Sequence, residues 1–304
     1  MLSRKDKLFF MSLLPLSLSL LAILIISIAV IGIRSIDSIS FFGPKLYTMN
    51  VWDPEAEVYG LLAPIAGSIV TSVIAILTAS FFSIPLTITI AEYLKGSTKN
   101  IVSSIVELMG GLPTIIYAVW ASQYLVLFLK QYVMDPLHSY LSFIPLFSCK
   151  PVTGFSVLAA GISIGISITP YVTALILEAY QSIPSTYREA CYGIGATRYE
   201  SIKILLSLAR PAIIAALVLG FARSLGETTI AVTTIGNSMN LNLCLFSPSY
   251  TVSALIASQF ANAYLYPYAE SVLYAGMLIL VIISILLSLY GSTTIIRWRS
   301  RVIV

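Results

Sequence analysis

Six stretches of this chain are long and apolar enough to cross a lipid bilayer, and they constrain its fold more than any other feature. Each approaches or exceeds the roughly 20 residues that a helix needs to span the hydrocarbon core. They lie at about Leu8–Ile33, Pro64–Ala91, Ile101–Leu129, Phe155–Leu177, Pro211–Ile235 and Ser271–Ile296. Because backbone polar groups find no water inside a bilayer, these stretches predict helices. The expected fold class is all-α: a polytopic membrane helical bundle of about six transmembrane helices.

The composition supports a membrane protein and excludes several other classes. Of 304 residues, 58% are hydrophobic and 10% are charged, against about 25% charged residues in a soluble domain. The net charge of +4 is small, and we interpret it through membrane topology and not as a sign of nucleic-acid binding. The single histidine, His138, has no Cys or His neighbour, so we expect no metal site. No Gly-x-x-x-x-Gly-Lys-Ser/Thr loop occurs, so we expect no bound ATP or other cofactor in this chain.

The basic residues in the loops and terminal segments predict an orientation. With the N-terminus in the cytoplasm, eleven of them lie inside and four outside, in keeping with the positive-inside rule. The inside set is Arg4, Lys5, Lys7, Lys95, Lys99, Arg188, Arg198, Lys203, Arg297, Arg299 and Arg301, and the outside set is Arg34, Lys45, Lys130 and Lys150. We therefore expect both termini in the cytoplasm. The first stretch is interpreted as an uncleaved span, because it exceeds the roughly 7–15 apolar residues of a signal peptide.

Two charges, Arg223 and Glu227, interrupt the fifth apolar stretch. A charge at the centre of a membrane helix costs about 2.5–3.5 kcal/mol on insertion scales, so intramembrane charges usually mark a polar path. Four residues apart on a continuous helix, the two side chains would share one face and partly compensate each other. The hydroxyls of Thr228 and Thr229 follow directly. The alternative is a buried ion pair that braces two helices.

A polar insert, Ser182–Lys203, separates the fourth and fifth apolar stretches. Pro184 and Ser185 suit the start of a helix, and glycines at 193 and 195 suit its end. Thr197 followed by Glu200 fits a capping box that opens a second helix. The insert is either an interfacial connector or a docking surface for a cytoplasmic partner.

Smaller signals concern the remaining helices and loops. Prolines at 85, 113 and 170 predict kinks that shape a cavity or are ordinary membrane-helix prolines, and the small-xxx-small spacing of Gly161 and Gly165 favours close helix packing. We expect the loop 34–63 to lie outside with a short helix or hairpin, and the uncharged loop 236–270 to pack against the spans. Cys149 and Cys244 both fall in outside loops, where they form either a disulfide or two free thiols.

Motifs in the insert and in the charged stretch resemble a known family. Glu189-Ala190-Cys191, followed by Gly195, resembles the Glu-Ala-Ala-x-x-x-Gly coupling motif of ABC importer permeases, although the usual Leu-Pro after it is absent. The segment from Phe221 to Asn237 resembles the Arg-Ala-Leu-Gly-Glu-Thr…Ile-Gly-Asn block of phosphate importer permeases of the PstC type. Gly110–Tyr117 is similar to that family's Gly-x-Pro-Ser-x-x-Tyr segment. The resemblance covers roughly residues 59–262.

The resemblance implies a type I ABC importer permease fold and a non-catalytic permease subunit of an ATP-driven phosphate importer in the cell membrane. Implied partners are a second homologous permease subunit, a dimer of ATP-binding ATPase subunits, an extracytoplasmic phosphate-binding protein, inorganic phosphate and membrane lipid. The implied substrate-pathway residues are Arg223, Glu227, Thr228 and Thr229. The implied ATPase-coupling residues are Arg188, Glu189, Ala190, Cys191 and Gly195.

The resemblance also leaves alternatives open. Permeases for sulfate, molybdate or tungstate carry a similar Arg-x-Leu-Gly-Glu block, usually with Phe after the Glu, and Thr228 favours phosphate. An ATP-independent transporter or channel is disfavoured by the Glu-Ala-Cys…Gly insert. A membrane enzyme is disfavoured because no carboxylate cluster, histidine pair or nucleophile arrangement occurs in the apolar stretches. We expect one membrane domain over 1–304, with a first span and outer loop at 1–63, a core permease at 64–296 and a coupling segment at 182–203.

Overall fold

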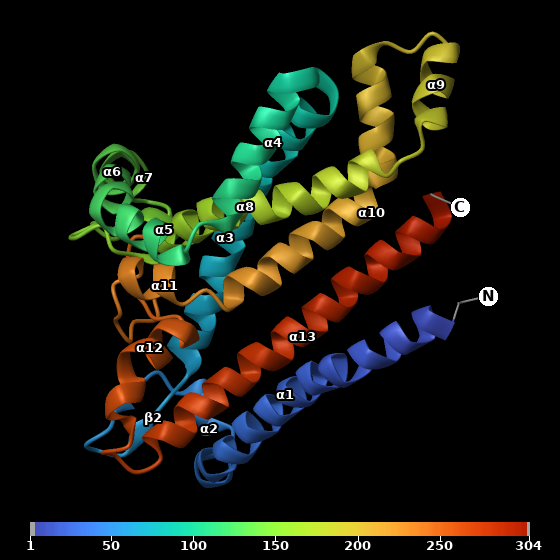
Figure 1. Cartoon of the computed structure of the whole chain (residues 1–304). Coiled ribbons are helices and arrows are strands. Elements are labelled where there is room, and N and C mark those ends of the chain that lie inside the picture. Colours follow the sequence, from blue (N-terminus) through green and yellow to red (C-terminus); the bar gives the residue numbers. More distant parts are fainter. Residues whose placement is uncertain (1–3, 303–304) are drawn as a thin grey trace.

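The structure is a computed structural model that describes residues 4–302, with side chains from Ser12 to Val302. The charged groups of Arg4, Lys5 and Lys7, which enter the orientation argument, lie outside the described side chains. Five helices are long and apolar enough to cross a membrane, and a bent helix pair makes a sixth candidate (Figure 1). The five are α1 (Arg4–Phe42), α3 (Leu62–Ile88), α8 (Val157–Gln181), α10 (Arg198–Leu225) and α13 (Ala269–Val302). The expected all-α bundle of about six spans is confirmed.

The third predicted span, Ile101–Leu129, falls in a bent helix pair, with the bend at Pro113, where the sequence analysis predicted a kink. Helix α4 (Gly96–Gly111) ends before Pro113, and the next helical segment continues to Leu141 at an angle of 89°. Pro113 has no amide hydrogen and forces extended backbone on Leu112, whose ψ is 136°. The second half consists of α5 (Thr114–Trp120), η2 (Ala121–Leu125), α6 (Val126–Leu129), η3 (Lys130–Met134) and α7 (Asp135–Leu141).

The fifth predicted span, Pro211–Ile235, is also broken. Helix α10 begins much earlier, at Arg198, and ends at Leu225. A short turn then leads into α11 (Thr229–Thr234). Arg223 therefore lies in the last turn of α10, whereas Glu227 lies outside any helix, so the prediction that both share one helical face is wrong.

Helix α8 is the centre of the bundle and packs most extensively against α3. Of its most apolar window, 61% is buried inside the chain. Gly161 and Gly165 allow this close approach, because a Cβ on Gly165 would lie 2.6 Å from Cβ of Thr78 on α3. The close packing predicted from their spacing is confirmed. By contrast, 0% of the window of α1 is buried, so its apolar side chains are left for lipid or another chain.

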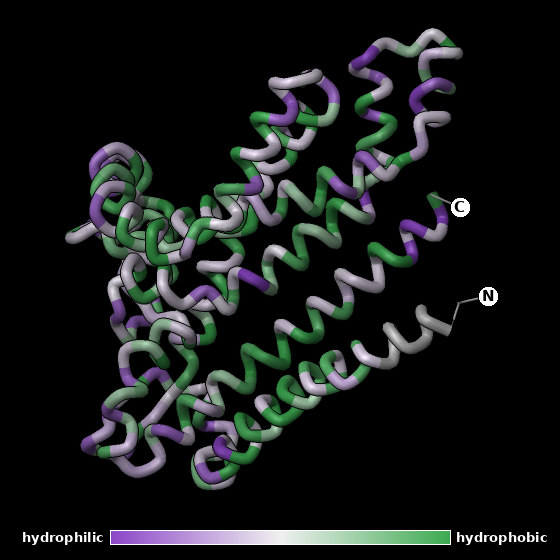
Figure 2. Tube along the Cα trace, in the orientation of Figure 1, coloured by the Kyte–Doolittle hydropathy of each residue, from purple (hydrophilic) through white to green (hydrophobic). Residues whose placement is uncertain are grey.

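One end of the bundle carries both described chain ends and the helix α9 (Ser185–Gly193), as Figure 1 shows. Hydrophobic residues run along the long helices, and hydrophilic ones gather towards both ends (Figure 2). Near the α9 end, α3 passes into a π-helical turn, η1 (Thr89–Tyr93), before α4 begins. We call this the coupling end, α9 the coupling helix and the opposite end the outer end, after the roles that the sequence analysis predicts for them.

The outer end contains a short helix, a hairpin and a packed loop. Helix α2 (Lys45–Thr48) and the antiparallel strands β1 (Trp52–Asp53) and β2 (Val58–Tyr59) confirm the structure expected in the first loop. The 3-10 turn η4 (Pro145–Phe147) precedes α8. The region 236–270 packs against the spans as predicted, but it also contains α12 (Val252–Ala263), which the sequence analysis missed. At 12 residues α12 is too short to span, so its apolar run gave no membrane signal.

Replacing Gly165 with alanine should destabilise the bundle. The new methyl group would meet Thr78 and the carbonyl oxygen of Ala75, 2.7 Å away, and overpacking of this kind costs about 1–3 kcal/mol. Thermal unfolding in lipid nanodiscs measures the loss. Gly32→Ala in α1 is the matched control, since nothing lies within 4 Å of the added atom. An equal effect of the two substitutions would contradict the packing argument.

Candidate functional site

Arg223 presents its guanidinium on an open face at the end of α10. Its side chain is exposed, and Cζ lies 4.8 Å from the centre of the Tyr171 ring on α8. A guanidinium over an aromatic face is attracted by the ring quadrupole, which fixes its position without neutralising its charge. Among the described side chains, no carboxylate forms an ion pair with Arg223. The ion pair with Glu227, which the sequence analysis gave as the alternative to a polar path, is therefore not formed.

Glu227 occupies the break between α10 and α11. The Glu227 amide donates to the Ser224 carbonyl at 3.2 Å. The hydroxyl of Ser253, on α12, donates to the Glu227 carbonyl at 2.9 Å. The Glu227 backbone is thus held by the end of α10 and by α12, and its side chain forms no salt bridge with Arg223.

Thr228 and Thr229 complete this segment and are half-buried. The Thr228 hydroxyl donates to the carbonyl of Gly226 at 3.3 Å. An apolar cavity of about 700 Å³ between α1 and α13 reaches Gly226 and Thr228, but Arg223 does not line it. The four predicted pathway residues therefore lie at the break between α10 and α11. Only Arg223 among them carries a positive charge.

The insert between α8 and α10 folds as the sequence analysis predicts. Helix α9 begins at Ser185 after Pro184, and Gly195 closes the turn at φ +84°, a left-handed conformation that glycine adopts without strain. Thr197 and Glu200 form the complete capping box of α10. The Thr197 amide and hydroxyl donate to Glu200 Oε2 at 2.8 and 2.7 Å.

The predicted coupling residues divide into exposed and inward-facing ones. Glu189, Ala190 and Gly195 are exposed at the tip of the insert. Cys191 is buried against the rest of the chain. Arg188 points back into the protein instead of towards a partner.

Glu92, at the end of η1, joins the coupling helix to the spans and was missed in the sequence analysis. Its carboxylate Oε1 accepts a hydrogen bond from Arg188 Nη2 at 2.6 Å and another from the Tyr180 hydroxyl at 2.8 Å. Arg198 donates to the Glu92 carbonyl and lies over the Tyr93 ring, 4.4 Å from its centre. The Glu92 side chain is only 6% exposed. The only sequence signal was a lone acidic residue directly after an apolar stretch that the analysis ended at Ala91.

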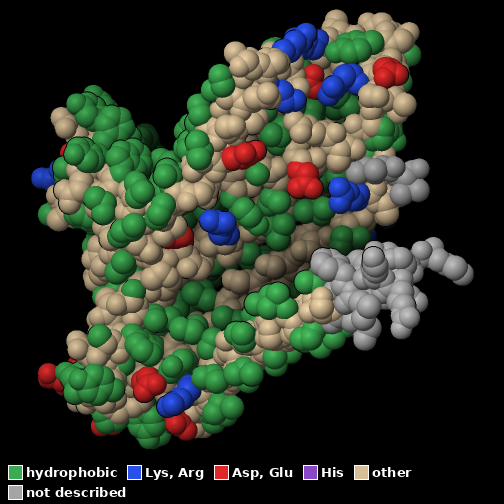
Figure 3. All heavy atoms as spheres, viewed as in Figure 1, with side chains coloured by type: hydrophobic (Ala, Val, Ile, Leu, Met, Phe, Trp, Pro, Cys, Tyr) green, Lys and Arg blue, Asp and Glu red, His purple; other side chains and the backbone are tan. Residues whose placement is uncertain are grey.

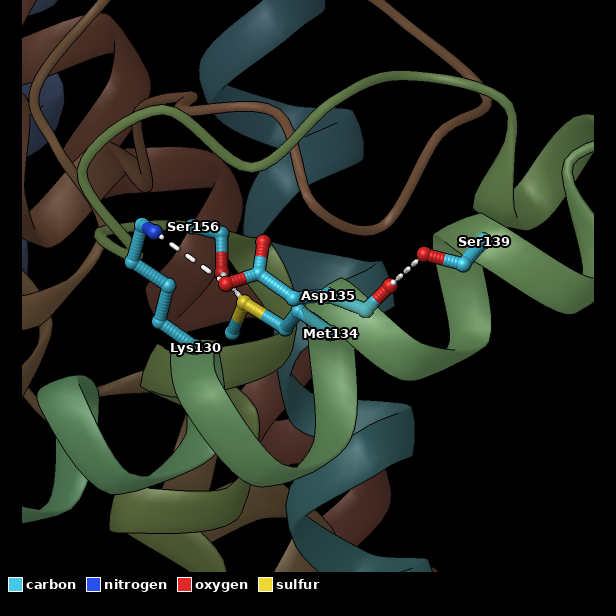
Figure 4. Close-up of polar contacts among 5 residues, drawn as sticks. All are labelled: Lys130, Met134, Asp135, Ser139 and Ser156. Atoms are coloured by element: carbon cyan, nitrogen blue, oxygen red, sulfur yellow. Dashed lines mark hydrogen bonds and ion pairs between the residues drawn. The ribbon is translucent and has the colours of Figure 1, made fainter.

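A disulfide closes the outer end, where Cys149 and Cys244 are bonded with their Cα atoms 6.0 Å apart. The bond joins the loop before α8 to the packed loop after α11. Nearby, Lys130 and Asp135 form an ion pair at 3.2 Å, and Met134 lies against Ser156 (Figure 4). The Ser156 hydroxyl oxygen accepts a hydrogen bond from the Ala159 amide at 3.2 Å and so caps the start of α8.

The fold and the site define a multi-pass helical membrane protein with a free guanidinium at a break in one span and a helical insert at one end. The family model for the binding-protein-dependent transport system inner membrane component matches residues 83–296. This chain belongs to that family.

Curated relatives and solved structures are similar to the chain over most of its length. A protein of Methanocaldococcus jannaschii, named probable phosphate transport system permease protein PstC, is 45% identical over 88% of this chain and 87% of its own. The phosphate transport system permease protein PstC of Mesorhizobium japonicum is 33% identical over 83% and 78%. An inward-facing structure of the MetNI methionine ABC transporter has the same fold, with a TM-score of 0.56 at 16% identity over 82% and 99% of the two chains.

Removing the disulfide should destabilise the chain. The bond closes a loop with a sequence separation of 95, and such bonds contribute typically about 2–4 kcal/mol. Thermal unfolding of the double variant Cys149→Ser, Cys244→Ser measures this loss and should not respond to reductant, whereas the natural chain should. Alkylation of the unfolded chain without reductant should modify only Cys191 of the three cysteines. Three modified thiols in the natural chain would disprove the bond.

Glu92 and Arg188 should be energetically coupled. Either single change, Glu92→Gln or Arg188→Gln, leaves the other side chain without its charged partner. The double variant should therefore lose less unfolding free energy than the two single variants together, by about 0.5–3 kcal/mol. A double-mutant cycle of unfolding free energies measures the coupling. The pair Lys130→Gln and Asp135→Asn is the control, because both side chains are at least 30% exposed and such pairs couple by less than about 1 kcal/mol. Additive losses at Glu92 and Arg188 would contradict the prediction.

Proposed function

We propose that this chain is the transmembrane permease subunit of an ATP-driven phosphate importer. The observation that carries the proposal is the Arg223 guanidinium, held at the break between α10 and α11 without a salt-bridge partner among the described carboxylates. The names of the similar PstC proteins support phosphate as the substrate.

Arg223 is the residue that meets the anion in this proposal. A guanidinium is charged at every physiological pH and offers a planar set of donors that matches a tetrahedral oxyanion. Tyr171 supports it from one side, so little conformational freedom is lost when phosphate binds. The hydroxyls of Thr228 and Thr229 add neutral donors. Glu227 adds a nearby negative charge, which weakens the binding of the phosphate dianion and so favours its release.

A second homologous permease subunit covers the open face. Arg223 is exposed on the isolated chain, and a lone charge facing lipid would be costly. A partner subunit that places its own polar segment opposite Arg223 would enclose a path between the two chains. The exposed apolar side chains of α1 offer further surface for lipid or for that subunit.

A dimer of ATPase subunits drives transport through α9. Glu189, Ala190 and Gly195 are exposed for docking, and ATP is bound by the ATPase and not by this chain. Helix α10 runs from the capping box directly to Arg223, so its 28 residues form a rod on the order of 40 Å long. Movement of α9 is thereby transmitted to the pathway residues, as alternating access requires.

The coupling end lies in the cytoplasm in this proposal, with both termini, as the excess of basic loop residues indicates. The outer end, with the hairpin, α12 and the disulfide, then faces the extracytoplasmic side, where a phosphate-binding protein delivers its ligand. The protein resides in the cell membrane.

Arg223→Ala should abolish phosphate uptake while the subunits still co-purify. Each charged hydrogen bond lost weakens anion binding by about 1.5–3 kcal/mol, or roughly tenfold or more. Arg223→Lys should retain part of the uptake, since the positive charge remains but the planar set of guanidinium donors is lost. Uptake into proteoliposomes with internal ATP measures the effect.

Arg210→Ala provides the control for that experiment, because Arg210 is an exposed arginine on the same helix, well before the break. Uptake of phosphate, sulfate and molybdate should be compared side by side. Normal phosphate uptake by Arg223→Ala would overturn the pathway role, and preferred uptake of sulfate or molybdate would overturn the substrate.

A further inference from the structure

A polar cavity lies at the coupling end, remote from Arg223. It has a volume of about 250 Å³ and is enclosed by η1, the end of α8 and parts of α4, α9 and α10. Its polar lining residues include Lys99 on α4, Gln181 at the end of α8, and Ser185 and Arg188 on α9. Leu205 of α10 also lines it, 18 residues before Arg223 and so roughly 27 Å away along the helix.

The cavity is lined by hydrogen-bond donors that lack partners. The side chains of Lys99, Gln181 and Ser185 make no hydrogen bond or ion pair with any described residue. Arg188 uses Nη2 for Glu92, and its Nε is buried without a hydrogen-bond partner. Of these donors only Arg188 Nε is buried, and a buried donor in a native protein normally has a partner, a water or a ligand. Gln181 and Ser185 are exposed and Lys99 is half-buried, so their donors are open to a ligand that enters the cavity.

The charges of the lining have one sign. Lys99 and Arg188 are its cations, and no Asp or Glu among the described residues lines the cavity. Glu92 neutralises part of the Arg188 charge from outside the lining, whereas Lys99 has no acidic partner within 4.0 Å among the described side chains. Figure 3 shows both basic and acidic side chains near α9, so the preference for an anion rests on the lining residues themselves.

We propose that this cavity binds a phosphate group and that the bound group links the coupling helix to α4. Lys99 supplies the charge from one side, and Ser185, Gln181 and Arg188 supply donors from the other. The ligand carries a tetrahedral phosphate in either of two forms: free inorganic phosphate or the headgroup of an anionic phospholipid. Because Lys99 and α9 belong to separate elements, binding restrains the movement of α9 and is a means by which phosphate at the coupling end slows transport.

The site is tested by the thermal stability of the full chain, purified with its partner subunits in nanodiscs of neutral lipid. Inorganic phosphate should raise the midpoint of unfolding by about 2–4 °C relative to chloride at equal ionic strength. Lys99→Gln should abolish the rise, and Ser185→Ala should weaken it. Lys95→Gln, which removes an exposed charge beside α4 without touching the cavity, should leave it unchanged.

Two further arms separate the ligand sources and the sites. In phosphate-free buffer, phosphatidylglycerol nanodiscs should raise the midpoint in a Lys99-dependent way if the headgroup is the ligand, and should not do so if free phosphate is. Arg223→Ala should keep the phosphate response, which makes the result independent of the proposed pathway. A response lost in Arg223→Ala but kept in Lys99→Gln, or no Lys99-dependent response to either ligand, would overturn the proposal.

Discussion

The arrangement of this chain depends on one constraint: within a bilayer, every backbone amide and carbonyl needs a partner inside the protein. The break after α10 meets this constraint locally. The amides of Gly226 and Glu227 donate to the carbonyls of Arg223 and Ser224 at 3.3 and 3.2 Å, and Ser253 of α12 donates to the Glu227 carbonyl. The break therefore relies on α12 for the partner of one of its carbonyls, which ties α12 to the end of α10.

At the coupling end, a single carboxylate plays the corresponding role. Glu92 accepts from Tyr180 on α8 and from Arg188 on α9, while its carbonyl accepts from Arg198 at the start of α10. These contacts tie the end of the second span to both sides of the insert. Because α10 is continuous from Arg198 to the break, the orientation of α9 and the position of Arg223 are parts of one connected arrangement.

Local signals in the sequence predicted local structure well. Pro184, Gly195 and the Thr197–Glu200 box each act through their own backbone, so the insert was predicted nearly residue by residue. Signals that depend on distant partners failed. The Glu227 carbonyl, just beyond the helix end at Leu225, accepts from a serine on α12 that is distant in the sequence. Nothing near Arg223 in the sequence indicates that its guanidinium contacts the Tyr171 ring instead of forming a salt bridge with Glu227.

The disulfide has a consequence for the order of biosynthesis. Cys149 and Cys244 lie at the same end of the bundle, and the segment between them contains α8, α9, α10 and α11. The covalent ring thus passes to the coupling end and back. Cys244 reaches the side of the membrane where Cys149 lies only after α8 and α10 have been inserted. The disulfide then forms after insertion, and its presence indicates that both helices have crossed the membrane. A cut within α9 would then leave the chain as one covalent molecule, held by a bond at the far end of the protein.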